Sequence, residues 1–139
     1  YLPSIRAAES GGNDSAANPT STALGRYQFL KSTWNELVDR YPGAGLSKDG
    51  RLDPAQQETA IRIFTAENAR YLRDRGVPLS NGTLYAAHFL GAGDATKVLQ
   101  ATSGNVSDYV PARVINANSF LRGMTVQQFK AWADRKGNK

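Results

Sequence analysis

A single glutamate, Glu9, stands where a short N-terminal helix is expected to end, because Gly11 and Gly12 follow it closely. A carboxylate at this end of a helix faces the negative end of the helix dipole, which disfavours its charged form by about 0.3–1 kcal/mol. Burial would favour the protonated acid further. A carboxylic acid that holds its proton near neutral pH is the group that general-acid cleavage of a glycosidic bond requires. Glu9 is therefore the candidate catalytic residue, and the alternative is a solvated surface position.

Few other carboxylates could share this chemistry. The remaining glutamates, Glu36, Glu58 and Glu67, lie on segments with helical spacing, and we interpret them as charged helix faces. Asp14, in the polar loop after Glu9, is the best candidate for a second carboxylate, although an ordinary turn residue is the favoured interpretation. An inverting hydrolase needs two carboxylates about 6.5–9.5 Å apart to admit water. The scarcity of glutamate therefore favours a mechanism that uses one carboxylate.

The segments that must position Glu9 carry helical signals. Apolar residues recur at three- and four-residue intervals, and there is no sustained period-2 alternation of the kind that indicates a strand. The expected helices cover residues 2–9, 25–41, 53–76, 83–90, 94–102, 111–118 and the segment from 125 onward, with a frayed tail over 135–139. The pattern predicts one compact all-α domain, residues 1–139, of six or seven short helices joined by glycine-rich loops.

Two of these helices have clear start signals. Asp53 precedes Pro54, with Gln56 three residues after the aspartate, which is typical of a capped helix start. Thr125 and Gln128 have the spacing of a capping box, in which each side chain bonds the backbone N–H of the other residue. Both helices are therefore expected to begin close to these residues.

Composition excludes several kinds of site. The 139 residues include no cysteine and one histidine, His88, so neither a thiolate metal site nor a multi-histidine site is possible. There is no glycine-rich phosphate loop in a strand-to-helix context, and no cofactor is expected. The net charge of +5 favours anionic partners, but the basic residues are spread along the chain and equally fit a solubilising surface. The start at Tyr1, without a signal-peptide pattern, predicts a processed product or an excised domain.

Three short motifs follow one another in the chain: Glu9-Ser10-Gly11-Gly12, Gly25-Arg26-Tyr27-Gln28 and Ala87-His88-Phe89-Leu90-Gly91. Their order resembles the catalytic domain of the soluble-type lytic transglycosylases, a family with a goose-lysozyme-like fold. In that family a Glu-Ser pair ends one helix, a Gly-Leu-Met-Gln-like motif opens the next, and an Ala-Tyr-Asn-Ala-Gly-like motif lies on a later one. The chain departs from it where His88 replaces Tyr and Phe89 replaces Asn, and these forms look more like the branch found in phage tail and wall-penetrating proteins.

The resemblance implies a lysozyme-like domain with its helices around a substrate cleft. It also implies cleavage of the β-1,4 bond between N-acetylmuramic acid and N-acetylglucosamine in bacterial peptidoglycan. The reaction would be non-hydrolytic, with Glu9 acting first as acid and then as base, and would leave 1,6-anhydromuramoyl ends. No protein nucleophile and no cofactor are implied.

The resemblance also suggests which residues hold the glycan. The candidate substrate-binding residues are Ser10, Tyr27, Gln28, His88, Phe89 and Tyr109. The Ser10 hydroxyl and the Gln28 amide would bond the acid or a sugar acetamide. Tyr109 matches a late tyrosine whose hydroxyl meets the catalytic glutamate in the family. Tyr27, His88 and Tyr109 fit core positions equally well, and for Phe89, as for Phe29, core packing is the favoured interpretation.

Other functions remain as alternatives at this stage. A hydrolytic muramidase would cleave the same bond on the same fold, with water in place of the sugar C6 hydroxyl. A non-catalytic peptidoglycan-binding module would not need an acid at Glu9. A basic nucleic-acid binder is disfavoured because no helix concentrates basic residues. The expected partner is the peptidoglycan glycan strand. The expected location is the bacterial periplasm, the cell wall or a phage virion, with no membrane span, and the domain is expected to be monomeric or part of a larger protein.

Overall fold

The computed structural model describes residues 2–3, 27 and 29–138. The chain divides into two compact units, residues 2–64 and residues 65–139, the second of which also includes Tyr1. Regular structure in the described residues is helical, apart from isolated bridge positions at Phe29 and in the antiparallel pair of Asn105 and Thr125. The expected all-α class is therefore confirmed.

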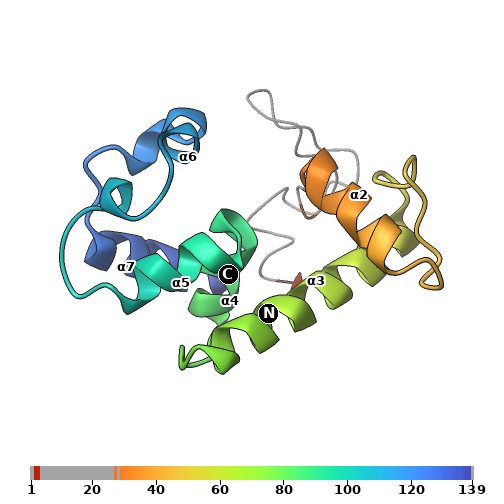
Figure 1. The fold of residues 1–139 in the computed structure, drawn as a ribbon, viewed down its shortest axis with the longest axis horizontal. Coiled ribbons are helices and arrows are strands. Elements are labelled where there is room, and N and C mark those ends of the chain that lie inside the picture. The colour runs from red at the N-terminus through yellow and green to blue at the C-terminus, as the bar shows by residue number, and fades with distance from the viewer. Residues whose placement is uncertain (1, 4–26, 28, 139) are drawn as a thin grey trace. The chain divides into compact units, whose positions relative to one another are not determined.

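The first unit contains α2 (Lys31–Arg40) and the first half of α3 (Pro54–Asp74), which continues into the second unit (Figure 1). Helix α2 begins later than the sequence predicted. Leu30 has an extended backbone, with φ −67° and ψ 148°, so the expected start at Gly25 is wrong. The apolar spacing misled because Phe29 and Leu30 continue the helical pattern into a segment that is not helical.

Aromatic residues dominate the core of the first unit. Trp34 is fully buried, and its ring lies edge-on to Phe29 with the ring centroids 5.5 Å apart. Phe29 also meets Phe64 of α3 in an edge-on contact, at 5.7 Å. The indole Nε1 of Trp34 donates a hydrogen bond of 2.8 Å to the Ser47 carbonyl oxygen. This bond fastens the loop between the two helices to α2, so the core and the loop form one packed body.

Helix α3 begins at Pro54, as the sequence predicted, but its cap differs from the expected pattern. The Asp53 carboxylate accepts a hydrogen bond of 3.2 Å from the Ala55 N–H. Gln56 does not face back toward Asp53: its Oε1 accepts a bond of 2.7 Å from the Ser47 N–H. The glutamine that reads as half of a capping box therefore holds the loop between α2 and α3.

The second unit is built from helices that pack side by side. Its elements after α3 are α4 (Asn81–Leu90), α5 (Ala92–Gln100), α6 (Ala112–Ala117) and α7 (Val126–Gly137), with short 3-10 helices at Val106–Asp108 and Ser119–Leu121. Helix α4 packs against α5 and α7, and α5 also contacts α7 (Figure 1). The expected capping box at the start of α7 is confirmed, since the Gln128 N–H bonds the Thr125 hydroxyl at 3.1 Å and the Thr125 N–H bonds Gln128 Oε1 at 2.9 Å.

The end of α7 is ordered further than expected. The helix runs to Gly137, which is buried, so the predicted fraying from Arg135 is wrong. A Cβ atom at Gly137 would collide with the carbonyl group of Asn81 at the start of α4. The amide of Asn81 also donates a hydrogen bond of 3.0 Å to the Asn138 side chain. The absence of a side chain at Gly137 therefore lets α7 approach α4 closely.

Candidate functional site

The predicted site residues fall on both sides of the division between the units. Glu9, Ser10 and Gln28 lie outside the described residues, as does Asp14. Tyr27 belongs to the first unit. The remaining candidates, His88, Phe89 and Tyr109, belong to the second unit.

Tyr27 is fixed in the core of the first unit. Its side chain is 2% exposed, and its hydroxyl donates a hydrogen bond of 2.7 Å to Glu58 Oε1 on α3. A buried phenol costs free energy unless its O–H finds a partner, and a carboxylate is a strong acceptor. The ring therefore acts as a structural anchor for the second motif and is not presented to solvent.

The residue after Gln28 is tethered as well. Phe29 is buried, and its carbonyl oxygen accepts a hydrogen bond of 3.3 Å from Arg51 Nη1. The two chain neighbours of Gln28 are thus both bonded to residues beyond α2, one on α3 and one in the loop that precedes it.

Glu58 is the partner of Tyr27 that the sequence analysis missed. The sequence suggested a charged helix face, but the carboxylate is half-buried and accepts the Tyr27 hydroxyl bond. Gln57 and Ile61, which border it on the helix, are both buried. Glu58 thus lies at the edge of the buried face of α3, where its carboxylate is partly shielded from water and can accept a hydrogen bond.

The third motif lies on the last turn of α4 and ends where the helix ends. Gly91 has φ 85°, and its N–H donates a hydrogen bond of 2.9 Å to the Ala87 carbonyl oxygen. Only glycine adopts such a positive φ without strain, so the motif's glycine is required by the turn between α4 and α5. The glycine at the end of this motif is therefore explained by the backbone conformation of the turn.

His88 and Phe89 have different surroundings on this turn. His88 is half-buried, and its ring centroid lies 6.3 Å from that of Tyr85. Phe89 packs edge-on against Trp132 of α7 at 5.0 Å and is tilted against Phe120 at 5.9 Å. Phe89 is therefore part of an aromatic cluster, which agrees with the packing role that the sequence favoured for it.

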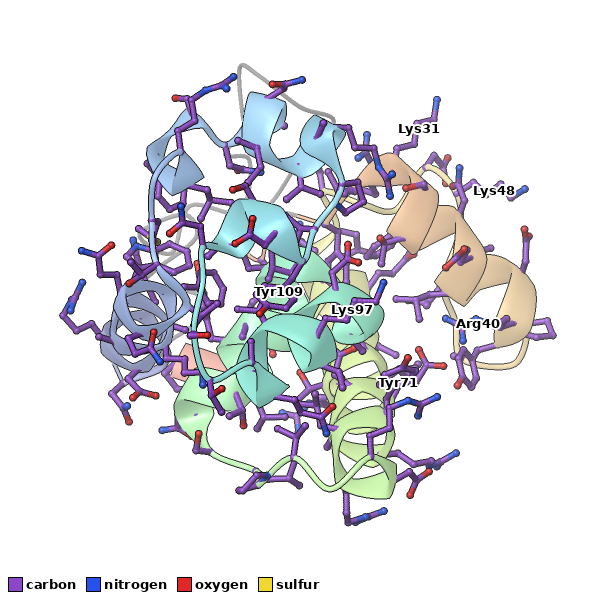
Figure 2. The ribbon with its side chains drawn as sticks, turned by 60° about the vertical axis from the view of Figure 1, so that its left-hand side comes forward. Lys31, Arg40, Lys48, Tyr71, Lys97 and Tyr109 are labelled. Atoms are coloured by element: carbon purple, nitrogen blue, oxygen red, sulfur yellow. The ribbon has the colours of Figure 1, made fainter. Side chains whose placement is uncertain are left out.

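Tyr109 follows the 3-10 helix Val106–Asp108 and is half-buried (Figure 2). Its hydroxyl donates a hydrogen bond of 2.9 Å to the Ser103 carbonyl oxygen. A phenol that donates in this way still has lone pairs with which to accept a bond from another group. The contact fixes the position of the hydroxyl and leaves its acceptor side available.

The described part of the chain offers little to other kinds of site. Within it, no three His, Cys, Asp or Glu side chains gather closely enough to hold a metal ion. Among its helices, none combines the length and the apolar character needed to cross a membrane. Lys31 and Lys48 extend away from the ribbon of the first unit, and Lys48 pairs with Asp39 at 3.5 Å (Figure 2). Such exposed pairs contribute little to stability.

Comparison with known proteins gives one consistent result. No family model matches the chain. Over 70 residues the chain is 39% identical to proteins named probable transglycosylase SceD from Staphylococcus aureus, among them those of strains Newman, USA300 and COL. The match covers 50% of this chain and 29% of each relative, so the matched part spans less than a third of the relatives' length. This similarity supports a transglycosylase-like family, whereas the phage or wall-penetrating branch stays a prediction.

Proposed function

We propose that this chain is a peptidoglycan lytic transglycosylase domain that cleaves the β-1,4 bond between N-acetylmuramic acid and N-acetylglucosamine. The observation that carries the proposal is the similarity to probable transglycosylases, at 39% identity over 70 residues. The order of the three motifs, beginning with Glu9-Ser10-Gly11-Gly12, agrees with it. The substrate is the glycan strand of bacterial peptidoglycan, so the protein acts in the periplasm or cell wall, or from a phage virion.

In the proposed reaction Glu9 carries a proton that it gives to the oxygen between the two sugars. The bond from that oxygen to C1 of the muramic acid breaks, and positive charge develops at C1. The acetamido oxygen of the substrate stabilises this centre, so no protein nucleophile is needed. Glu9, now ionised, takes the proton of the C6 hydroxyl, and that oxygen closes on C1. The products are a 1,6-anhydromuramoyl end and a free N-acetylglucosamine 4-hydroxyl, and no water is consumed.

The tethering of the second motif supports a positioning role for Gln28. Its neighbours Tyr27 and Phe29 are buried and hydrogen-bonded to Glu58 and Arg51. Ordered residues beside a binding position lower the conformational entropy that is lost on binding. In the proposal the Gln28 amide donates to and accepts from a sugar acetamide or Glu9. Tyr27 then acts through Gln28 and does not touch the sugar.

The remaining candidates take supporting roles in the same proposal. The Ser10 hydroxyl orients the Glu9 carboxyl, or touches the sugar acetamide. His88, on the last turn of α4, lines the sugar cleft. The resemblance assigns Tyr109 to the acid, and its hydroxyl donates to the Ser103 carbonyl oxygen.

The test is mass spectrometry of the muropeptides released from purified sacculi by the wild type and by Glu9→Gln. The wild type is expected to release anhydro ends. Glu9→Gln removes the transferable proton and should lower the rate by about 10²–10⁴-fold, the usual contribution of general acid–base catalysis. The matched control is Glu36→Gln on α2, the same change at an exposed position, which should cleave like the wild type.

Three results would contradict the proposal in different ways. Products with only reducing ends would show that water reaches C1, and the domain would be a hydrolytic muramidase. Full cleavage by Glu9→Gln would remove Glu9 from the mechanism. If the wild type bound sacculi and released nothing, the domain would be a binding module.

A further inference from the structure

Three aromatic rings meet at one place in the second unit, where α4, the 3-10 helix Ser119–Leu121 and α7 each supply one. These rings, here called the aromatic patch, are Phe89, Phe120 and Trp132. The centroid distances are 5.0 Å between Phe89 and Trp132, 5.1 Å between Phe120 and Trp132, and 5.9 Å between Phe89 and Phe120. The three rings therefore form a continuous cluster.

The rings of the aromatic patch are more exposed to solvent than rings in the core. Phe120 is 47% exposed, and Phe89 and Trp132 are both only half-buried. Burial of an aromatic ring of this size is favourable, so rings that remain in water gain from being covered by a ligand. A group of partly exposed large apolar side chains is typical of a surface that binds a partner.

Buried residues hold the patch in place from beneath. Tyr85, 3% exposed, meets the Trp132 ring edge-on at 5.5 Å, and the fully buried Phe129 contacts the same ring at 5.5 Å. The rings are therefore positioned before any ligand arrives. A surface that is already ordered binds with a smaller loss of conformational entropy.

Charge is unevenly divided between the two units, and the patch lies in the positive one. Residues 65–139 contain ten Lys and Arg against five Asp and Glu, a net +5, whereas residues 2–64 contain seven of each. The whole net charge of the chain thus belongs to the unit that carries the patch. Lys136 reinforces this locally, because its Nζ lies 5.9 Å from the Trp132 ring centroid.

We infer that the aromatic patch binds the glycan strands of peptidoglycan, by stacking pyranose rings on Phe120 and Trp132. One face of a pyranose presents C–H bonds, which carry partial positive charge and pack against the negative face of an aromatic ring. Peptidoglycan also bears carboxylates on its peptide stems, which suit Lys136 and the positive unit. The inference rests on the proposed function, because that names the polymer, and it adds a binding surface to it.

Tryptophan fluorescence provides the first test. The chain has two tryptophans, and Trp34 is fully buried in the first unit. In the Glu9→Gln background, which prevents cleavage, titration with the hexamer of N-acetylglucosamine should change the emission of Trp132. Trp132→Phe keeps an aromatic ring and should abolish this change while leaving the Trp34 emission. An unchanged spectrum in the parent protein would overturn the inference.

Co-sedimentation with purified sacculi provides the second test, again in the Glu9→Gln background. Phe120→Ala should weaken binding by about 3–10-fold, the range expected for losing one stacked ring. Phe120→Trp should bind like the parent, whereas Phe120→Leu, which is apolar without a ring, should resemble Phe120→Ala. The matched control is Leu79→Ala, because Leu79 is 44% exposed in the same unit and does not belong to the patch.

The outcomes separate this inference from the proposed function. Binding of Phe120→Ala equal to that of Leu79→Ala would overturn the patch and leave the muropeptide result for Glu9 intact. Equal binding by Phe120→Leu and Phe120→Trp would show that apolar area, and not ring stacking, is what matters. Failure of the N-acetylglucosamine hexamer to compete with sacculi would exclude the glycan as the occupant and indicate binding to the peptide stems.

Discussion

In residues 27–64 three large rings, Tyr27, Phe29 and Trp34, are buried and none is fully exposed, whereas in residues 65–139 part of the aromatic cluster reaches the surface. Trp34 of the first unit is fully buried, and Phe29 is 3% exposed. Phe120 of the second unit is 47% exposed and lies against a half-buried Trp132. Two units of one small chain thus use the same residue types differently: the first uses rings to build its core, and the second also displays them.

The charges follow the same division. Residues 2–64 are balanced, with seven basic and seven acidic residues, and they include the candidate acid Glu9. Residues 65–139 carry the excess of five positive charges. A surface that holds an anionic polymer gains from positive charge. The excess charge of residues 65–139 therefore agrees with the adsorption proposed for the aromatic patch.

The largest expected effect is on stability and compares one ring from each unit. Trp34→Ala should lower the free energy of unfolding by about 3–5 kcal/mol, because it leaves a cavity in a closed core and removes the bond to the Ser47 carbonyl. Phe120→Ala should cost about 1 kcal/mol or less, because much of that ring is already in water. Urea unfolding followed by circular dichroism measures both.

Equal losses of unfolding free energy in the two variants would show that the rings of the two units are buried to the same extent. A large loss at Phe120 would show that its ring is a core residue, and the patch would then be a packing feature. Phe120→Leu refines the result, since it keeps apolar volume and should unfold at nearly the same urea concentration as the wild type.

The next effect compares one tyrosine hydroxyl from each unit. Tyr27→Phe removes the bond of 2.7 Å to the Glu58 carboxylate, and a hydrogen bond to a charged group contributes about 1.5–3 kcal/mol. Tyr109→Phe removes a bond of 2.9 Å to the Ser103 carbonyl at an exposed site and should cost about 0.5–1 kcal/mol. The difference is measured by urea unfolding of the two variants side by side.

A double-mutant cycle sharpens this prediction and tests positioning of the second motif. Adding Glu58→Ala to Tyr27→Phe should lower the free energy of unfolding little further, because the hydrogen bond that the two residues share is already absent. Muropeptide release by Tyr27→Phe should fall while sacculus binding is kept, if the anchor acts through Gln28. Additive losses of unfolding free energy in the two variants would show that Tyr27 and Glu58 are not coupled. Unchanged muropeptide release by Tyr27→Phe would show that Tyr27 does not position the site.

The features of the fold that could be predicted are those set by residues close together in the sequence. Helix periodicity and the capping box at Thr125 are encoded within a few residues, and both appear as expected. The start of α2 and the end of α7 were missed because they depend on distant contacts. Leu30 is extended despite its apolar spacing, and Gly137 lies inside a helix because it packs against Asn81.

The candidate site likewise has features that the sequence predicts and features that only the structure reveals. The order of motifs and the glycine at the end of α4 can be found in the sequence, and Gly91 has the positive φ that its position suggests. The bond between Tyr27 and Glu58 joins residues 31 positions apart, which no local pattern encodes. The aromatic patch likewise combines three elements, so its openness to solvent could not be inferred from Phe89 alone.

The smallest effect compares how the helices of the two units begin. Thr125 caps α7 through its hydroxyl, whereas Leu30 precedes α2 with no side-chain cap. Thr125→Ala should therefore cost about 1 kcal/mol, and Leu30→Ser should stabilise the chain by about 0.5–1 kcal/mol, because an extended N-cap position suits a serine. Leu30 is 43% exposed, so the change loses little burial. A shift of the urea midpoint in the same direction for both variants would show that the start of α2 is held by packing and not by its cap.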